Sequence, residues 1–142
     1  MSFNVAFAVN SKNQIEEKHF GGAAKYLIYK KVANKMMLSS EIINSFHSPP
    51  VGPYKGSQKR VDSLIENLKK KNVNVLVSAK YCDNINVLNK YFIPVKILQR
   101  QPDIVLNRIN KNLYWMEEEW KHHSTNFKLF TISSGILKTT IN

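Results

Sequence analysis

Two side chains in this sequence have the chemistry to bind a soft or borderline metal, the imidazole of His19 and the thiol of Cys82. His19 ends a polar stretch and is followed closely by Gly21 and Gly22, which permit a sharp turn or a close approach of the backbone to a ligand. Cys82 precedes Asp83, a favourable N-cap residue, and the dipole of a following helix would favour the thiolate. A surface histidine that only hydrogen-bonds its turn, and a buried cysteine beside a repelling aspartate, are the alternative interpretations.

A third feature is a loop that leads into a helix. Residues 45–57 are rich in Pro, Gly and Ser, and the helix expected after Gly56 would present free amide groups that attract anions. Lys55 adds positive charge beside that position. His47 in the same loop is a further candidate ligand, although a loop histidine is more often only solvated. We therefore expect an anion near Lys55 and Gly56.

The composition narrows the class of partner. The 142 residues carry a formal charge of +11, from 21 Lys and Arg against 10 Asp and Glu, which favours anionic partners. Nucleic acid, an acidic protein surface and an anionic metal–sulfur cluster all satisfy that condition, and so do solvated surface lysines without a partner. One cysteine excludes an internal disulfide, and no run of eighteen apolar residues occurs, so we expect a soluble cytoplasmic protein without a membrane partner.

The apolar pattern predicts an α/β fold. Val61, Ile65 and Leu68 recur at helical spacing, whereas the segment from Val73 to Ala79 is a continuous apolar run typical of a buried strand. The expected order is βββαβαβα. The strands are 4–10, 25–32, 36–43, 73–79 and 95–98, and the helices are 59–71, one from Asp83 that carries Phe92, and one from Pro102.

The segment His19-Phe20-Gly21-Gly22-Ala23, with an apolar strand before it and an aromatic strand after it, resembles the dinitrogenase iron-molybdenum cofactor biosynthesis family, the group of NifX, NafY and the C-terminal domain of NifB. The resemblance covers about residues 4–110. It implies a ribonuclease H-like three-layer fold, a mixed five-stranded sheet with helices on both faces. The domains would then be a cofactor-binding domain, 1–112, and a C-terminal extension, 113–142, that packs on it or on a partner.

The resemblance also implies the place and the role of the site. The first strand and strand 73–79 would lie side by side and parallel, so that the loops carrying His19 and Cys82 open on one edge of the sheet. An iron–molybdenum or iron–sulfur cluster would bind His19 and Cys82, with Phe20, Gly21, Gly22, Lys55 and Gly56 around it. Such proteins are non-catalytic carriers that exchange the cluster with donor and acceptor proteins. The sequence departs from the family at Lys80-Tyr81, where glycines are common, and at three prolines in the loop 45–57.

Two other function classes compete with the carrier. A two-metal nuclease needs carboxylates that converge on the sheet, but the expected strands contain only Glu41, so we expect no enzymatic activity. A cluster-free basic module for nucleic acid or a protein is the alternative to a carrier. In such a module, tyrosine rings would stack on nucleic-acid bases and nearby lysines would contact the phosphates. The tyrosines are Tyr26, Tyr29, Tyr54 and Tyr81, and the lysines are Lys25, Lys30, Lys55 and Lys80.

The C-terminal extension has three open roles. Trp115, Trp120 and the strand-like segment 127–133 would form an added layer, a homodimer contact or a partner surface. His122 and His123 are adjacent and suit chelation only on an irregular backbone, so we expect a surface feature.

Overall fold

A computed structural model describes residues 3–44, 57–81, 85–133 and 136–140 of the chain. Its strands form one mixed sheet of seven strands in the order β3-β2-β1-β4-β5-β6-β7. The strands are β1 (Asn4–Val9), β2 (Lys25–Val32), β3 (Lys35–Ile43), β4 (Val73–Ser78), β5 (Ile93–Ile97), β6 (Leu129–Ser133) and β7 (Ile136–Thr140). The helices are η1 (Phe20–Gly22), α1 (Ser57–Lys70), α2 (Ile85–Leu88) and α3 (Pro102–His122).

The centre of the sheet is parallel and both edges are antiparallel. β1, β4, β5 and β6 pair in parallel, whereas β2 and β3 on one side and β7 on the other run antiparallel to their neighbours. The expected neighbourhood of β1 and β4 is therefore confirmed. Parallel neighbours must be joined by crossovers, and α1, α2 and α3 lie in the connections before β4, β5 and β6.

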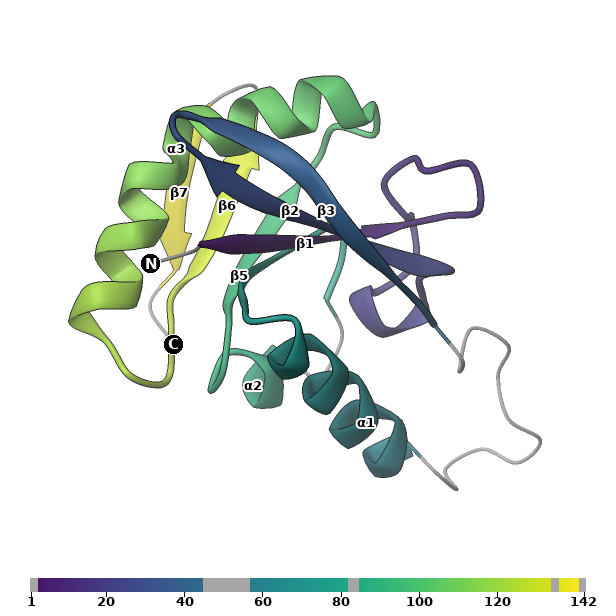
Figure 1. Cartoon of the computed structure of the whole chain (residues 1–142). Helices are drawn as coiled ribbons and strands as arrows, with labels where there is room; N and C mark the ends of the chain where they lie inside the picture. Colours follow the sequence, from purple (N-terminus) through teal and green to yellow (C-terminus); the bar gives the residue numbers. More distant parts are fainter. Residues whose placement is uncertain (1–2, 45–56, 82–84, 134–135, 141–142) are drawn as a thin grey trace.

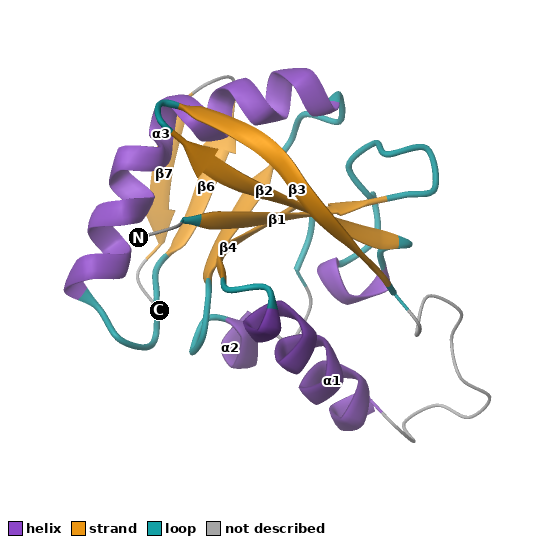
Figure 2. Cartoon of the chain, in the orientation of Figure 1, coloured by secondary structure: helices purple, strands orange, loops and turns teal. Residues whose placement is uncertain are grey.

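Two apolar layers cover the two faces of the sheet. Val61, Ile65 and Leu68 of α1 pack with Leu88 of α2 on one face, and Val105, Ile109, Leu113 and Met116 of α3 pack on the other. Figures 1 and 2 show α1 and α2 on one side of the sheet and α3 on the opposite side. The expected three-layer α/β arrangement is confirmed, because each helix buries its apolar stripe against one face.

The expected number of five strands is wrong. The segment after α3 supplies β6 and β7 to the same sheet, and the expected boundary between residues 112 and 113 lies inside α3. The second expected helix is also shorter, since α2 ends at Leu88 and β5 already begins at Ile93. Pro94 is tolerated there because the pairing of β5 with β6 starts only at Val95, so no ladder bond to β6 is lost.

The C-terminal segment adds its own aromatic contact. Trp120 stacks on Phe127, with ring centroids 5.0 Å apart and planes 7° from parallel, and Phe127 is buried. Trp115, by contrast, is 56% exposed. One tryptophan therefore attaches the end of α3 to the start of β6, and the other faces outward.

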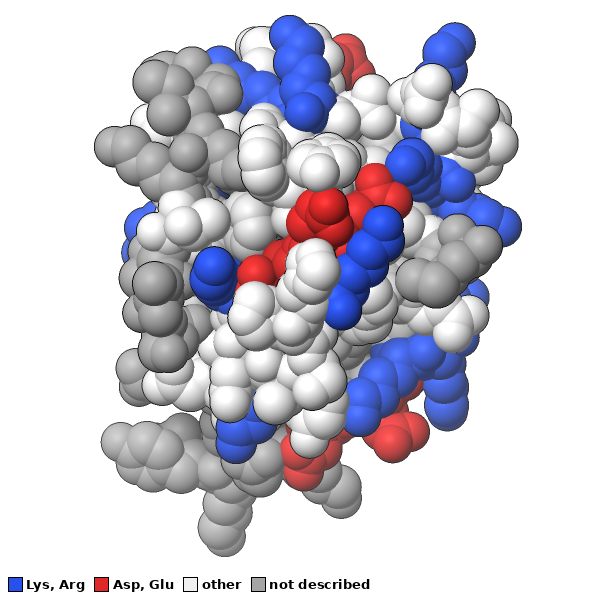
Figure 3. All heavy atoms as spheres, turned by 90° about the vertical axis from the view of Figure 1, so that its left-hand side faces the viewer, with Lys and Arg blue, Asp and Glu red and all other residues white. Residues whose placement is uncertain are grey.

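The surface is basic overall but uneven. Figure 3 shows the side of the molecule on which α3 and β7 lie, where acidic side chains gather near the centre with Lys and Arg beside them. α3 contributes three consecutive acidic residues, Glu117, Glu118 and Glu119. Among the described residues, no helix combines the length and the apolar character needed to cross a lipid bilayer.

Candidate functional site

The loop that carries His19 begins with a turn closed by Asn10. The Asn10 Oδ1 atom accepts hydrogen bonds from the backbone N–H of Lys12 at 2.9 Å and of Gln14 at 3.1 Å. Asn13 has a φ of 63°, a left-handed conformation that asparagine tolerates better than most residues. The polar residues between β1 and His19 thus form a defined turn, because their side chains replace the missing ladder bonds.

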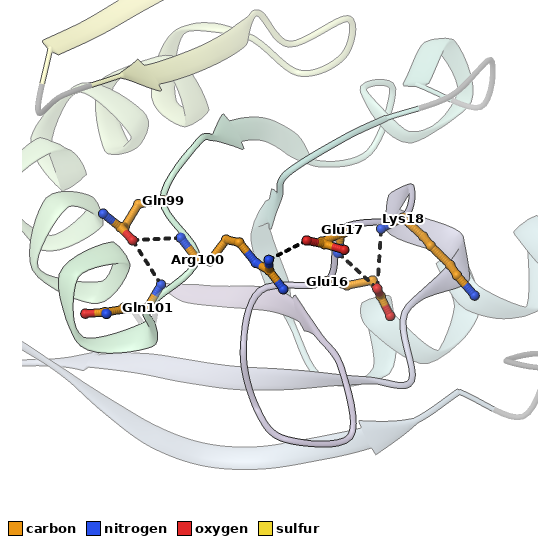
Figure 4. A network of polar contacts seen from close by, with 6 residues as sticks. All are labelled: Glu16, Glu17, Lys18, Gln99, Arg100 and Gln101. Atoms are coloured by element: carbon orange, nitrogen blue, oxygen red, sulfur yellow. Dashed lines mark hydrogen bonds and ion pairs between the residues drawn. The ribbon is translucent and has the colours of Figure 1, made fainter.

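The second half of the loop is attached to the rest of the domain. The Glu16 N–H donates to the carbonyl of Ala8 in β1 at 3.0 Å, and the N–H of fully buried Ile15 donates to the carbonyl of Arg100 at 3.2 Å. An ion pair between Arg100 and Glu17 spans the same two segments (Figure 4). Both side chains of this ion pair are more than half exposed, so it contributes little to stability. The backbone hydrogen bonds and the burial of Ile15 therefore hold the loop in place.

Two short side-chain bridges shape the backbone on either side of that ion pair. Glu16, which is buried, uses Oε2 to accept from the N–H groups of Glu17 at 2.9 Å and Lys18 at 3.3 Å. Gln99 does the same for the N–H groups of Arg100 and Gln101. Figure 4 shows both bridges, which hold the residues directly before His19 and directly before α3.

His19 lies against the glycine turn that follows it. It precedes η1 with extended backbone angles, its side chain is half-buried, and its Nδ1 atom is inaccessible to solvent. A Cβ atom added at Gly21 would meet the imidazole Cε1 at 3.4 Å, and one added at Gly22 would meet Nε2 at 3.4 Å. Neither glycine has a positive φ. A Cβ at either glycine would therefore touch the ring at an ordinary contact distance, and the glycines leave that side of the imidazole uncovered without an unusual backbone angle.

The side chains of Tyr26 and Asn44 hold the glycine turn in place through hydrogen bonds to its carbonyl groups. The Tyr26 hydroxyl donates to the carbonyl of Phe20 at 2.8 Å, and the Asn44 Nδ2 group donates to the carbonyls of Gly21 at 3.0 Å and Ala23 at 2.7 Å. Phe20 itself is 1% exposed and packs on Tyr26. Its side chain is thus an anchor in the core and does not face a ligand. The carbonyls of Phe20, Gly21 and Ala23 each have a side-chain donor.

The loop after β4 meets the His19 loop directly. The N–H of Phe20 donates to the carbonyl of Lys80 at 3.0 Å, and the hydroxyl of buried Ser78 donates to the same carbonyl at 2.9 Å. The expectation that both loops open on one edge of the sheet is confirmed by this contact. It follows from the parallel pairing of β1 with β4, which sends both chains out of the sheet in the same direction.

Tyr81 joins this edge to the sheet. Its ring stacks on Phe20 at a centroid distance of 6.0 Å, and its hydroxyl lies 3.0 Å from the carbonyl oxygens of both Leu76 and Val95. The hydroxyl also accepts from the Val95 N–H at 3.2 Å. Burial raises the pKa of Tyr81 well above its usual range, so the hydroxyl keeps its proton. Tyr81 therefore packs inward rather than filling the space beside His19.

The structure brings together part of the site expected from the sequence. His19, Phe20, Gly21 and Gly22 form one turn beside Lys80. Cys82, Lys55 and Gly56 lie outside the described residues, as do His47 and Asp83. His122 and His123 are exposed at the end of α3, as expected.

The supporting residues were not identified from the sequence. Asn44 gives no sequence signal beyond standing at the end of a strand, and Tyr26 reads equally well as a core or a surface aromatic residue. Their roles depend on β2 and β3 lying under the turn, which periodicity alone does not specify. Within the described ranges, no three or more His, Cys, Asp or Glu side chains group to hold a metal ion.

No protein-family model matches this sequence, and no curated protein matches it.

Proposed function

We propose that this protein is a non-catalytic carrier of an anionic metal–sulfur cluster, of the iron–molybdenum or iron–sulfur type handled in dinitrogenase cofactor biosynthesis. The proposal includes a ribonuclease H-like arrangement of the central strands and the family resemblance drawn from His19 to Ala23. Cluster donor and acceptor proteins would be its partners.

The observation that carries the proposal is the contact between two loops. Phe20 N–H donates to the carbonyl of Lys80 at 3.0 Å, which places the segment with His19 against the segment that precedes Cys82 by two residues in the sequence. A nitrogen ligand and a sulfur ligand from two different segments would then meet at one edge of the sheet. These ligand types suit iron and other borderline or soft metals.

The glycine turn brings the backbone close to the His19 imidazole, and the small number of candidate ligands suits a carrier. Without a Cβ at Gly21 and Gly22, the Cε1 and Nε2 side of the imidazole is not covered from the turn. This gap is only wide enough for one carbon atom, because a Cβ there would already be in contact with the ring. Few protein ligands suit a carrier, because transfer requires release and a closed four-ligand cage resists it.

Charge also supports an anionic cargo. Lys18 precedes His19 and Lys80 lies at the adjoining loop, and both lysines are exposed. With a formal charge of +11 the whole protein attracts anions, and the two lysines belong to the segments that meet at the turn, where the carboxylates of Glu16 and Glu17 offset part of the positive charge.

The nucleic-acid alternative loses part of its support. Tyr26 is fully buried, and the Tyr81 ring packs on Phe20 with its hydroxyl bonded inside the sheet. Neither ring is free to stack on a base. Tyr29 is half-buried against Phe7, and Tyr54 lies outside the described residues.

The test is anaerobic reconstitution of the purified protein with iron, sulfide and molybdate, followed by metal analysis and visible absorption. Wild type is compared with His19→Ala and Cys82→Ala. His123→Ala is the matched control, since His123 is an exposed histidine directly after α3, whose end lies away from the His19 loop in Figure 1.

The expected result is stoichiometric coloured uptake that His19→Ala or Cys82→Ala abolishes and that His123→Ala leaves intact. Absence of uptake, or uptake indifferent to both substitutions, would overturn the carrier. Steeply salt-dependent binding of nucleic acid that needs neither residue would then favour the basic binding module.

A further inference from the structure

The C-terminal end of α3 carries two Glu–His pairs at the same spacing, four residues apart. Glu119 and His123 form one pair, with the His123 Nδ1 atom 3.2 Å from Oε1. Glu118 and His122 form the other, with the His122 Nε2 atom 3.6 Å from Oε2. Residues at this spacing lie on the same side of a helix, so each pair presents two donors together.

The first pair is structural. The Glu119 side chain is 5% exposed, and its Oε2 atom accepts from the backbone N–H of Lys128 at 2.9 Å. That bond ties the end of α3 to the segment entering β6. What sets this carboxylate apart from that of Glu118 is its burial, since a side chain only 5% exposed and tied to the Lys128 N–H is closed to a hydrated metal ion.

The second pair is open to solvent and oriented. His122 is 72% exposed, and Glu118 has one oxygen, Oε1, that accepts from the Tyr114 hydroxyl at 2.9 Å. The other oxygen, Oε2, is the one near His122. The Tyr114 hydroxyl therefore fixes the orientation of the Glu118 carboxylate, as hydrogen-bond partners do for the side chains that bind metals.

The distance and the surroundings suit a cation. Two donors held tetrahedrally about 2.1 Å from a metal lie about 3.4 Å apart, close to the 3.6 Å that separates Nε2 and Oε2. His122 is the last residue of α3, where the negative end of the helix dipole favours positive charge. Both side chains line a hollow of about 270 Å³ whose walls include Trp115, Phe130 and one cationic residue, Lys128.

We propose that Glu118 and His122 bind one borderline divalent metal ion, of the zinc and copper class, independently of the His19 site. The protein supplies two ligands and water completes the coordination. Imidazole nitrogen with one carboxylate is a donor set that these metals accept, and Cu²⁺ is the best probe because it binds such ligands most strongly.

The experiment is a titration of the full-length protein with Cu²⁺ in a non-coordinating buffer at neutral pH, followed by quenching of Trp115 fluorescence. Wild type should show saturable quenching. Glu118→Gln and His122→Ala should each weaken binding at least tenfold, and Tyr114→Phe should weaken it by less. Trp115→Phe removes the Trp115 part of the fluorescence and leaves that of Trp120, but it should keep the same nitrogen coupling in the electron paramagnetic resonance spectrum of bound Cu²⁺.

His123→Ala and His19→Ala are the controls, and both should bind within twofold of wild type at the α3 site. Equal binding by wild type, Glu118→Gln and His122→Ala would overturn the proposal, and so would an equal loss in His123→Ala. Because cluster uptake depends on His19 and this site does not, failure of one proposal leaves the other standing. Circular dichroism of each variant checks that the fold is kept.

Discussion

The backbone N–H of Phe20 donates a 3.0 Å hydrogen bond to the carbonyl of Lys80, and this bond joins the two loops that leave the sheet from neighbouring parallel strands. Ser78 donates to the same carbonyl, and Tyr81 stacks on Phe20. The edge of the sheet beside His19 is therefore a single packed unit, in which a substitution in one loop alters the contacts of the other.

Adding a methyl group at Gly22 should cover His19 without unfolding the protein. The new Cβ would lie 3.4 Å from Nε2, an ordinary contact distance, and Gly22 has no positive φ. We expect Gly22→Ala to leave stability unchanged or to raise it by up to about 1 kcal/mol, because alanine loses less entropy on folding. The rate at which diethyl pyrocarbonate modifies His19, followed by mass spectrometry, should fall severalfold.

The modification of His122 in the same Gly22→Ala sample is the internal control and should not change. A His19 rate equal to that of wild type would show that the turn does not govern access to the imidazole. A large loss of stability would show that the turn has no room for the methyl group.

Removing the Tyr26 hydroxyl should destabilise the protein. Tyr26 is fully buried and donates to the carbonyl of Phe20 at 2.8 Å, so Tyr26→Phe leaves that carbonyl without this donor. We expect a loss of about 1–2 kcal/mol in the free energy of unfolding, measured by urea denaturation. Tyr114→Phe removes a hydroxyl from an exposed residue and should cost less than about 0.5 kcal/mol. Equal losses in the two variants would contradict the role of Tyr26 under the turn.

Tyr81 should make stability sensitive to alkaline pH. Burial raises its pKa in the folded protein, so above about pH 10 the unfolded chain loses this proton while the folded protein keeps it. Stability from this group is then fully present below pH 10 and falls as the pH rises further, by at most about 1.4 kcal/mol per pH unit.

The comparison for Tyr81 is with Tyr81→Phe, which has no proton to lose. Urea denaturation at pH 9, 10 and 11 should show the stability of wild type converging on that of the variant. Parallel pH curves for the two proteins would mean that the hydroxyl ionises as easily in the folded state as in the unfolded one.

Neutralising Glu119 should lower the free energy of unfolding more than neutralising Glu118. Glu119 is buried and accepts from the Lys128 N–H, whereas Glu118 is partly exposed. We expect Glu119→Gln to lower the free energy of unfolding by about 1–3 kcal/mol and Glu118→Gln by less than about 1 kcal/mol. Thermal denaturation of both variants at one pH makes the comparison, and a larger effect at Glu118 would refute it.

Local pattern was enough to predict several elements. The apolar run 73–79 predicts a buried strand and corresponds to β4, and Pro102 begins α3 as expected. Val61, Ile65 and Leu68, which recur at helical spacing, form the buried side of α1. Adjacent Met36 and Met37 face opposite sides of β3, one buried and one 55% exposed, as alternation requires. These features depend on residues close together in the sequence.

Where the sequence interpretation was wrong, long-range packing made the difference. The segment after residue 112 looked like an extension because its pattern does not show which strand it will join. In the fold, α3 covers one face of the sheet and returns the chain beside β5, so β6 and β7 enlarge the same sheet. The short α2 has a similar cause, since Ile93 and Pro94 are taken up by pairing with β4.

The sequence by itself determined the mixed α/β order, the cationic surface and the presence of an imidazole at a glycine turn, because each follows from residue type and local spacing. Only the tertiary structure decided that the Phe20 amide meets the Lys80 carbonyl, that Tyr81 packs inward and that Tyr26 and Asn44 support the turn. These contacts join strands distant in the sequence, and their partners are set by the packing of the sheet and helices as a whole.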